Sequence, residues 1–253
     1  ATRAMQMLRE EETNAMQLET IIQGDPAIAA KLLKVANSAL FGGEAHITSV
    51  SQAIVRIGMD TTTQMVMGFA MENLFISDSK AIKKRMHNLW YHSVNVASIA
   101  AVIAKKIRIF DSGQAMLAGL IHDIGKVAIL SYIDKNNYNI SEVAIDNALS
   151  RLRAEIGSMI LSKWNFPEVF ISVCEGAEDW HRDQNLEADL GDLILIAQLH
   201  ANIQNPVMLD VPPMFELPAF QKLGLNQWSP DTGLEIIHEA EKEVKDIVRL
   251  FAA

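Results

Sequence analysis

The chain has 253 residues, a formal net charge of −9 at pH 7, and a composition that is 49% hydrophobic and 21% charged. This is the balance of an ordinary globular protein, and the length is sufficient for a core that needs no disulfide or metal to hold it together. The acidic excess argues against nucleic acid and an anionic membrane surface as partners, and we expect no segment long and apolar enough to span a membrane.

Cys174 is the only cysteine, so no disulfide can form within the chain, and we expect a reducing, cytoplasmic location. It lies in an apolar run and is interpreted as buried filler rather than a reactive thiol. Aromatic residues make up 6% of the chain, whereas Ala, Ile, Leu and Met are plentiful. This composition favours helices over strands, and we find no strand alternation, so we predict an all-α fold.

Residues 1–78 are predicted to form an N-terminal helical subdomain, and residues 79–253 the remaining helical core. A first helix is predicted over 4–23. The signals that follow are Gly24 as a stop, Asp25-Pro26 as an N-cap and first helical residue, Asn37-Ser38 as a stop, Ser49 to Gln52 as a capping box, Gly58 as a stop and Asp60 as a cap. Ser77-Asp78-Ser79 marks the predicted break between the two parts.

The centre of the chain is predicted to be two helices. The first covers about 81–108, where Val96, Ile99, Ile103 and Ile107 form a core stripe and His92 lies on the same inward face. The second begins at Asp111 and is predicted to end at Gly125. Apolar or small residues on two of its sides predict a central helix that neighbours pack closely.

The remainder is also predicted to be helical. The expected segments are helices near 141–149 and 151–165, a new helix start at Pro167, a charged loop at 178–188, an apolar helix at 189–203, a proline-rich excursion at 205–219 and a C-terminal return to helix.

The stretch from Ile121 to Lys126 contains the adjacent pair His122 and Asp123. An imidazole nitrogen and a carboxylate from one short piece of backbone are the ligand chemistry of a hydrolytic metal centre.

The chain resembles the HDOD domain family, which is related to the HD metal-dependent phosphohydrolases. The likeness covers roughly residues 15–250 and depends on the order and spacing of several short stretches. These are Asp25-Pro26, Asn37-Ser38-Ala39, Ile47-Thr48-Ser49, Gln52-Ala53-Ile54, Ile57-Gly58, Trp90-Tyr91-His92-Ser93, Leu117 to Lys126, Gly157, and Trp164-Asn165-Phe166-Pro167. The resemblance implies a single all-α unit over 1–253, with an HD-like helical core and additional N-terminal and C-terminal helices.

The resemblance also implies a partial metal site. His92, His122 and Asp123 match three ligand positions of the HD hydrolases. Other positions depart from the family pattern: Arg153, Ala177, Glu178 and Gln198 stand where relatives often carry histidine or aspartate. Glu178 and Asp192 are candidates to compensate. A cationic Arg153 would repel a divalent metal, pair with Asp123, or contact a small anion.

Three functions remain open from the sequence. The leading hypothesis is a non-catalytic, cytoplasmic signal-transduction or regulatory domain that acts on another signalling protein or domain, with no cofactor expected. The alternative is a metal-dependent phosphohydrolase that acts on a nucleotide or phosphate ester. The third is a binding module for a small anion or nucleotide around His122 and Arg153. The alternative to a metal site is a structural network, in which Asp123 accepts a hydrogen bond from the ring of His92 and no metal is needed.

Overall fold

The computed structural model describes residues 14–38, 40–43, 45–136, 138, 140–183, 186–203, 213–225, 244–245, 247–249 and 251. Across this part of the chain every regular element is a helix and no strand occurs, which confirms the all-α prediction. The α-helices are α2 (Ala15–Gln23), α3 (Pro26–Ala36), α4 (Val50–Ile57), α5 (Met59–Met71), α6 (Lys80–Ile107), α7 (Ser112–Ile121), α8 (Ile124–Lys135), α9 (Glu142–Lys163), α10 (Glu168–Gly176), α11 (Leu190–Ile203) and α12 (Pro218–Lys222). Two 3₁₀ helices, η1 (Glu72–Phe75) and η2 (Met214–Glu216), complete the set. The predicted start of the first helix, much of the proline-rich excursion and most of the C-terminal helix lie outside the described residues.

Most predicted helix starts are confirmed by their caps. Asp25 accepts hydrogen bonds from the backbone of Ala27 and Ile28 at 3.0 and 3.2 Å, with Pro26 in the first turn of α3. Ser49 and Asp111 cap α4 and α7 in the same way. The prediction for Asp60 is wrong, because α5 begins one residue earlier and Asp60 lies in its first turn. Its charge still favours the helix there, through the positive end of the helix dipole.

Two other predictions of where helices end are wrong. Gly125 does not end a helix: α7 ends at Ile121, and Gly125 lies in the first turn of α8, a helix that the sequence analysis did not assign. The two helices expected near 141–149 and 151–165 are one continuous helix, α9. No proline interrupts α9, and Ser150 is compatible with a helix interior.

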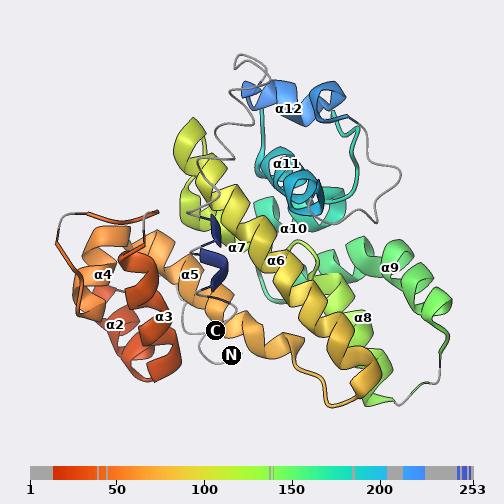
Figure 1. Cartoon of the computed structure of the whole chain (residues 1–253), viewed down its shortest axis with the longest axis horizontal. Coiled ribbons are helices and arrows are strands. Elements are labelled where there is room, and N and C mark those ends of the chain that lie inside the picture. The colour runs from red at the N-terminus through yellow and green to blue at the C-terminus, as the bar shows by residue number, and fades with distance from the viewer. Residues whose placement is uncertain are drawn as a thin grey trace.

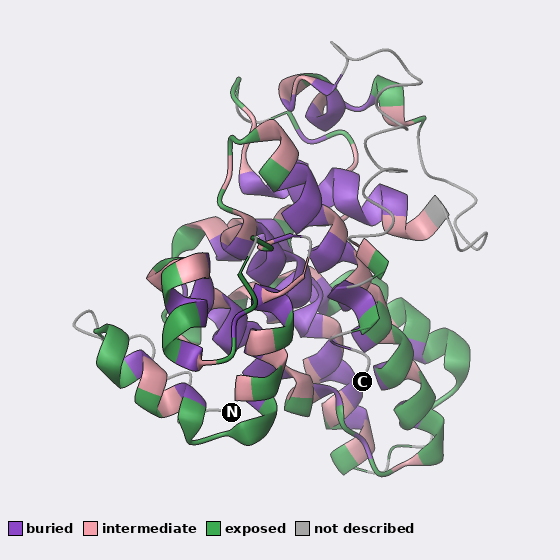
Figure 2. Ribbon diagram, turned by 60° about the vertical axis from the view of Figure 1, so that its left-hand side comes forward, coloured by how far each residue is buried: buried purple, intermediate pink, exposed green. Residues whose placement is uncertain are grey.

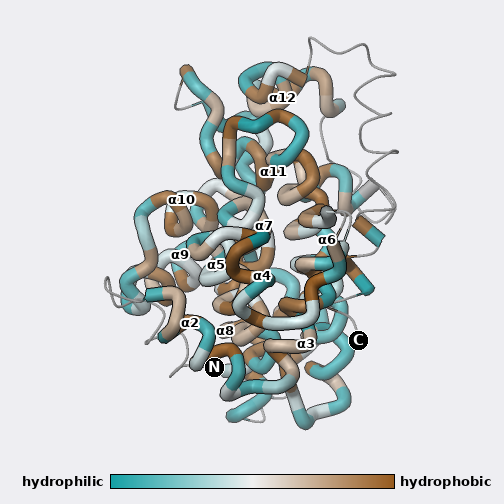
Figure 3. Tube along the Cα trace, turned by 90° about the vertical axis from the view of Figure 1, so that its left-hand side faces the viewer, coloured by the Kyte–Doolittle hydropathy of each residue, from teal (hydrophilic) through white to brown (hydrophobic). Residues whose placement is uncertain are grey.

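Helix α6 runs diagonally through the centre of the molecule (Figure 1). Helices α2 to α5 gather at one end, α8 and α9 lie along another side, and α10 to α12 form a third group. Buried residues concentrate where these groups meet, as Figure 2 shows. Hydrophobic stretches follow the same pattern, for example on α11 in Figure 3. Helix α7 is buried at eight of its ten positions, which confirms the prediction of a central helix.

The expectation about membrane spans needs correction. The segment Ser112–Lys135 is long and apolar enough to cross a membrane by length and composition. However, 78% of the 18-residue apolar window within it is buried inside the protein, and the segment is divided into α7 and α8 at His122 and Asp123. Its apolar character is explained by its place in the core.

Two glycines allow unusually close helix packing. A Cβ atom added at Gly119 would lie 2.4 Å from the Cα atom of Ala97, so the backbones of α7 and α6 touch there. A Cβ atom added at Gly125 would lie 2.0 Å from the carbonyl oxygen of Arg153, which brings α8 equally close to α9. These two contacts set the distances between the helices that carry the candidate site.

Phe251, the last residue that the structure describes, packs against α5 and α6. The ring of Phe251 lies 4.9 Å from Phe69 of α5 and 6.1 Å from Trp90 of α6, measured between ring centroids. The indole Nε1 of Trp90 also donates a hydrogen bond of 3.3 Å to the carbonyl oxygen of Phe251. The division of the chain at residue 78 stays a prediction.

Gly119→Ala and Gly125→Ala are each expected to lower the free energy of unfolding by roughly 1–3 kcal/mol, because the added methyl group collides with backbone that cannot move aside. Urea unfolding followed by circular dichroism measures the change. Gly43→Ala is the matched control, since a Cβ atom there would meet only ordinary contacts of 3.5 Å or more with Arg56. If Gly119→Ala is as stable as this control, the close packing of α6 and α7 is wrong.

Candidate functional site

The structure brings together the three residues that the sequence singled out. His92 lies on α6, and His122 and Asp123 form the turn between α7 and α8. One possible ligand atom from each lies within 4.8 Å of the other two, and the centroids of the two imidazole rings are 5.3 Å apart. His122 and Asp123 are each 2% exposed. We call this group the donor triad.

The backbone fixes the tautomer of His122. Its Nδ1 lies 2.7 Å from the carbonyl oxygen of Gly119. Because a carbonyl oxygen only accepts, Nδ1 carries the proton and Nε2 is left with a lone pair. That Nε2 is buried without a hydrogen-bond partner and lies 3.4 Å from Oδ2 of Asp123. Oδ1 of Asp123 is buried without a partner as well. Two orphaned electron-pair donors side by side, with His92 close by, fit a divalent cation that keeps an open position.

Two positively charged side chains, those of Lys126 and Arg153, lie next to Asp123 of the donor triad. Nζ of Lys126 donates to Oδ2 of Asp123 at 2.8 Å and to Oε1 of Glu178 at 2.9 Å. Nη1 of Arg153 lies 3.9 Å from Oδ1 of Asp123, and its Nε lies 3.0 Å from Oε2 of Glu178. These four residues form a closed arrangement of two anions and two cations, which we call the ion-pair square. The expected contact between Arg153 and Asp123 is therefore present.

Charge and burial fix the protonation states around the triad. Burial lowers the pKa of His92 to about 4, and burial likewise lowers the pKa of His122. Burial opposes ionisation of Asp123, but Lys126 and the two histidines outweigh it and hold the pKa of this carboxyl below its usual range. Burial also opposes the charge on Lys126, yet Asp123 and Glu178 raise its pKa. At neutral pH both imidazoles are neutral and the carboxylate and ammonium are charged.

The other residues that were considered for the site, Glu178, Asp192 and Gln198, make contacts outside the donor triad. Glu178 belongs to the ion-pair square, and Asp192 lies 3.4 Å from Arg182 and 3.8 Å from Lys222, so neither joins the donor triad. The side-chain amide of Gln198 donates to the carbonyl oxygen of Ala177.

The hydrogen bond to Asp123 comes from Lys126, and among the described residues none joins Asp123 to the ring of His92. Lys126 was not predicted as part of the site, although its spacing of three residues from Asp123 is a helical pairing signal.

The helical fold resembles that of several solved structures. A protein from Shewanella amazonensis SB2B, provisionally described as a metal-dependent phosphohydrolase, has a TM-score of 0.80 at 21% identity, covering 98% of this chain and 89% of that one. An HDOD domain protein of unknown function from Geobacter sulfurreducens has a TM-score of 0.68 at 19% identity, covering 98% and 89%. A protein from Marinobacter aquaeolei VT8, provisionally described as a signal transduction protein, has a TM-score of 0.61 at 15% identity, covering 99% and 59%. These likenesses establish the fold class as HD-like and helical.

The family model of the HDOD domain matches residues 1–179, and the chain belongs to this family. An uncharacterized protein from Treponema pallidum is 25% identical over 189 residues, which are 68% of this chain and 35% of that protein. The chain thus spans about a third of the length of this curated relative.

Acidification is expected to destabilise the protein between pH 6.5 and 4. His92 and the buried His200 of α11 both have a pKa that burial lowers to about 4. An unfolded histidine binds a proton near pH 6.5, so in this window the unfolded state binds more protons and gains stability as the pH falls. Urea unfolding at pH 7.0 and 5.5 should show a loss that His200→Gln reduces by about 1 kcal/mol. Equal stability of the parent protein at both pH values would contradict the burial of these imidazoles.

Proposed function

We propose that this chain is a non-catalytic regulatory domain that transmits a signal to another signalling protein or domain in the cytoplasm. The ion-pair square carries the proposal. Asp123 is the one carboxylate of the donor triad, and its charge is already balanced by Lys126 at 2.8 Å and Arg153 at 3.9 Å. Glu178 balances the same two cations from the other side, so the four charges sum to zero without a metal ion.

A divalent ion and the ammonium group of Lys126 would compete for the carboxylate of Asp123. A divalent ion bound to Asp123 would lie about 2 Å from its carboxylate and therefore within a few ångströms of the Lys126 ammonium. Repulsion between such charges is poorly screened at a buried site. Binding the metal would require Lys126 to leave, which would also break its contact with Glu178. The geometry therefore favours Lys126, rather than a metal ion, as the cation beside Asp123.

Other observations support the regulatory role. Arg153 and Ala177 supply no donor for a metal at positions where relatives often have histidine, and the Gln198 amide is held by the carbonyl oxygen of Ala177. Membership of the HDOD family is consistent with signalling, and the Marinobacter aquaeolei protein with the same fold is provisionally described in that way. We propose no cofactor for this role.

The purified chain is expected to hold less than one equivalent of metal and to show no turnover. Metal analysis by mass spectrometry and assays against mononucleotides, cyclic dinucleotides and a p-nitrophenyl phosphodiester measure both properties. Lys126→Gln removes the competing charge, so we expect it to tighten Mn²⁺ binding at least about tenfold, as measured by electron paramagnetic resonance titration. Lys135→Gln, at the other end of α8, is the matched control. Stoichiometric metal with turnover that Asp123→Asn abolishes would overturn the proposal.

The donor triad favours a second candidate, a metal-dependent phosphohydrolase acting on a nucleotide or phosphate ester. His92, Nε2 of His122 and Oδ1 of Asp123 would hold the ion, because the latter two atoms are buried without hydrogen-bond partners. A divalent ion there would polarise a phosphate ester and activate water. Arg153 would bind the phosphate, since its guanidinium is buried with Nη1 lacking a hydrogen-bond partner. In this candidate Arg153→Gln raises KM for a phosphate ester, whereas Asp123→Asn removes kcat.

A further inference from the structure

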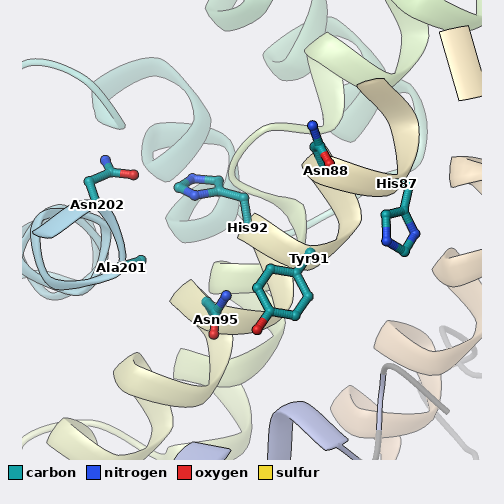
Figure 4. Close-up of a pocket in the computed structure, with 7 residues that line it drawn as sticks. All are labelled: His87, Asn88, Tyr91, His92, Asn95, Ala201 and Asn202. Atoms are coloured by element: carbon teal, nitrogen blue, oxygen red, sulfur yellow. The ribbon is translucent and has the colours of Figure 1, made fainter. Parts of the chain in front are cut away.

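Helices α8 and α9, at the edge of the molecule (Figure 1), form an apolar groove of about 500 Å³, which we call the α8–α9 groove. Its lining includes Ala128 and Tyr132 of α8 and Ala148, Leu152 and Ile156 of α9. Every described residue that lines it is aliphatic or aromatic. The cavity of similar volume beside His92, between α6 and α11, instead has Asn88 and Asn95 in its lining (Figure 4). The α8–α9 groove therefore suits the apolar face of a protein helix.

The groove belongs to a wider apolar surface. Six of the thirteen large apolar side chains that are exposed in the described part of the chain lie between the end of α8 and the end of α9: Tyr132, Tyr138, Ile140, Val143, Leu152 and Met159. Met159 is 64% exposed and follows Leu152 by seven residues, so it projects from the same face of α9. Exposed apolar side chains gathered in this way mark a surface that another protein covers.

The charges on α9 indicate which protein covers this surface. Arg151 and Glu155 are exposed at the border of the apolar face, and among the described residues neither has an ion-pair partner. They lie four residues apart on one helix. A two-fold axis that crosses α9 midway between them places Arg151 of one copy opposite Glu155 of the other, and the reverse. The outer face of α9 is thus complementary in charge to its own antiparallel copy.

The same symmetric arrangement matches other parts of α9. Lys163, its last residue, is brought to the level of Glu142, its first residue, whose side chain is 73% exposed. Met159 of one copy is brought to the level of Ala148 of the other, where a small residue lines the groove. A projecting side chain and a hollow lie at equivalent distances from the axis, which is the requirement for an interface between identical surfaces.

We infer that a second copy of this chain covers the α8–α9 groove, with the two α9 helices antiparallel across an axis between Arg151 and Glu155. The α8–α9 hairpins of the two copies pack together as a bundle, and each copy contributes Met159 to the groove of the other. A different partner protein would not require α9 to complement itself, whereas a symmetric dimer does. The dimer depends neither on the proposed regulatory function nor on a metal at the donor triad.

Sedimentation velocity of the full chain between about 1 and 100 µM tests for the dimer. We expect a monomer–dimer equilibrium with a dissociation constant in the micromolar range or below. Met159→Gln should raise this constant at least about tenfold, because the axis repeats the lost apolar contact twice. Met16→Gln is the matched control, since Met16 is an exposed methionine of α2, far from α9 in Figure 1, and it should change nothing.

Charge reversal locates the axis. Arg151→Glu and Glu155→Arg should each raise the dissociation constant at least about tenfold, because each places like charges opposite one another at two symmetry-related positions. Mixing the two variants should give a mixed dimer as stable as the parent dimer, since both contacts then join opposite charges again. A merely structural role of either residue would not produce this recovery. Circular dichroism checks that each variant is folded.

A chain that stays monomeric at about 100 µM would show that no second copy covers the groove, while the regulatory proposal would stand. A dimer that neither charge reversal weakens, or whose two reversed variants do not recover on mixing, uses another surface and is equally against the inference. The same holds if Met16→Gln and Met159→Gln weaken the dimer to the same extent. A chain that dimerises as expected but also hydrolyses a phosphate ester keeps the dimer and loses the regulatory proposal.

Discussion

The contact of α7 with α6 at Gly119 and Ala97 is the constraint on which the candidate site depends. Backbone-to-backbone packing at this point brings the turn at His122 within reach of His92 on the neighbouring helix. The carbonyl oxygen of the same Gly119 orients the imidazole of His122 and fixes its tautomer. One residue therefore sets both the spacing of the two helices and the chemical state of a side chain between them. Because α7 is buried at eight of its ten positions, neither can be adjusted without repacking the core.

The buried negative charge of Asp123 determines which cations the site can hold. A buried carboxylate needs a cation, and here the candidates are a metal ion or the side chains of Lys126 and Arg153. In the described structure the side chains make that contact, while Nε2 of His122 and Oδ1 of Asp123 have no hydrogen-bond partner. The site therefore combines three possible metal ligands with side-chain counter-ions of its own. Removing one partner of such a buried pair costs roughly 3–5 kcal/mol, so this arrangement is also part of the stability of the core.

Local signals in the sequence predicted the fold class and most helix starts, because caps such as Asp25 and Asp111 act on their nearest neighbours. The triad could be predicted from motif resemblance. The ion-pair square could not be predicted in full, since Glu178 reaches Lys126 from 52 residues away. Helix α8 was missed because Gly125, normally a stop signal, is used there for close packing against Arg153.

Helix α6 connects the donor triad with α9. Its 28 residues form a rod of about 42 Å, and near one end Arg85 pairs with Glu142 and Asp146 of α9. Toward its middle lie His92 of the donor triad and Trp90, which donates a hydrogen bond to the carbonyl oxygen of Phe251. Such a helix acts as a lever: a tilt of about 5° around its midpoint displaces each end by roughly 2 Å. A tilt of α6 would therefore move α9 as well, because the ion pairs of Arg85 join the two helices.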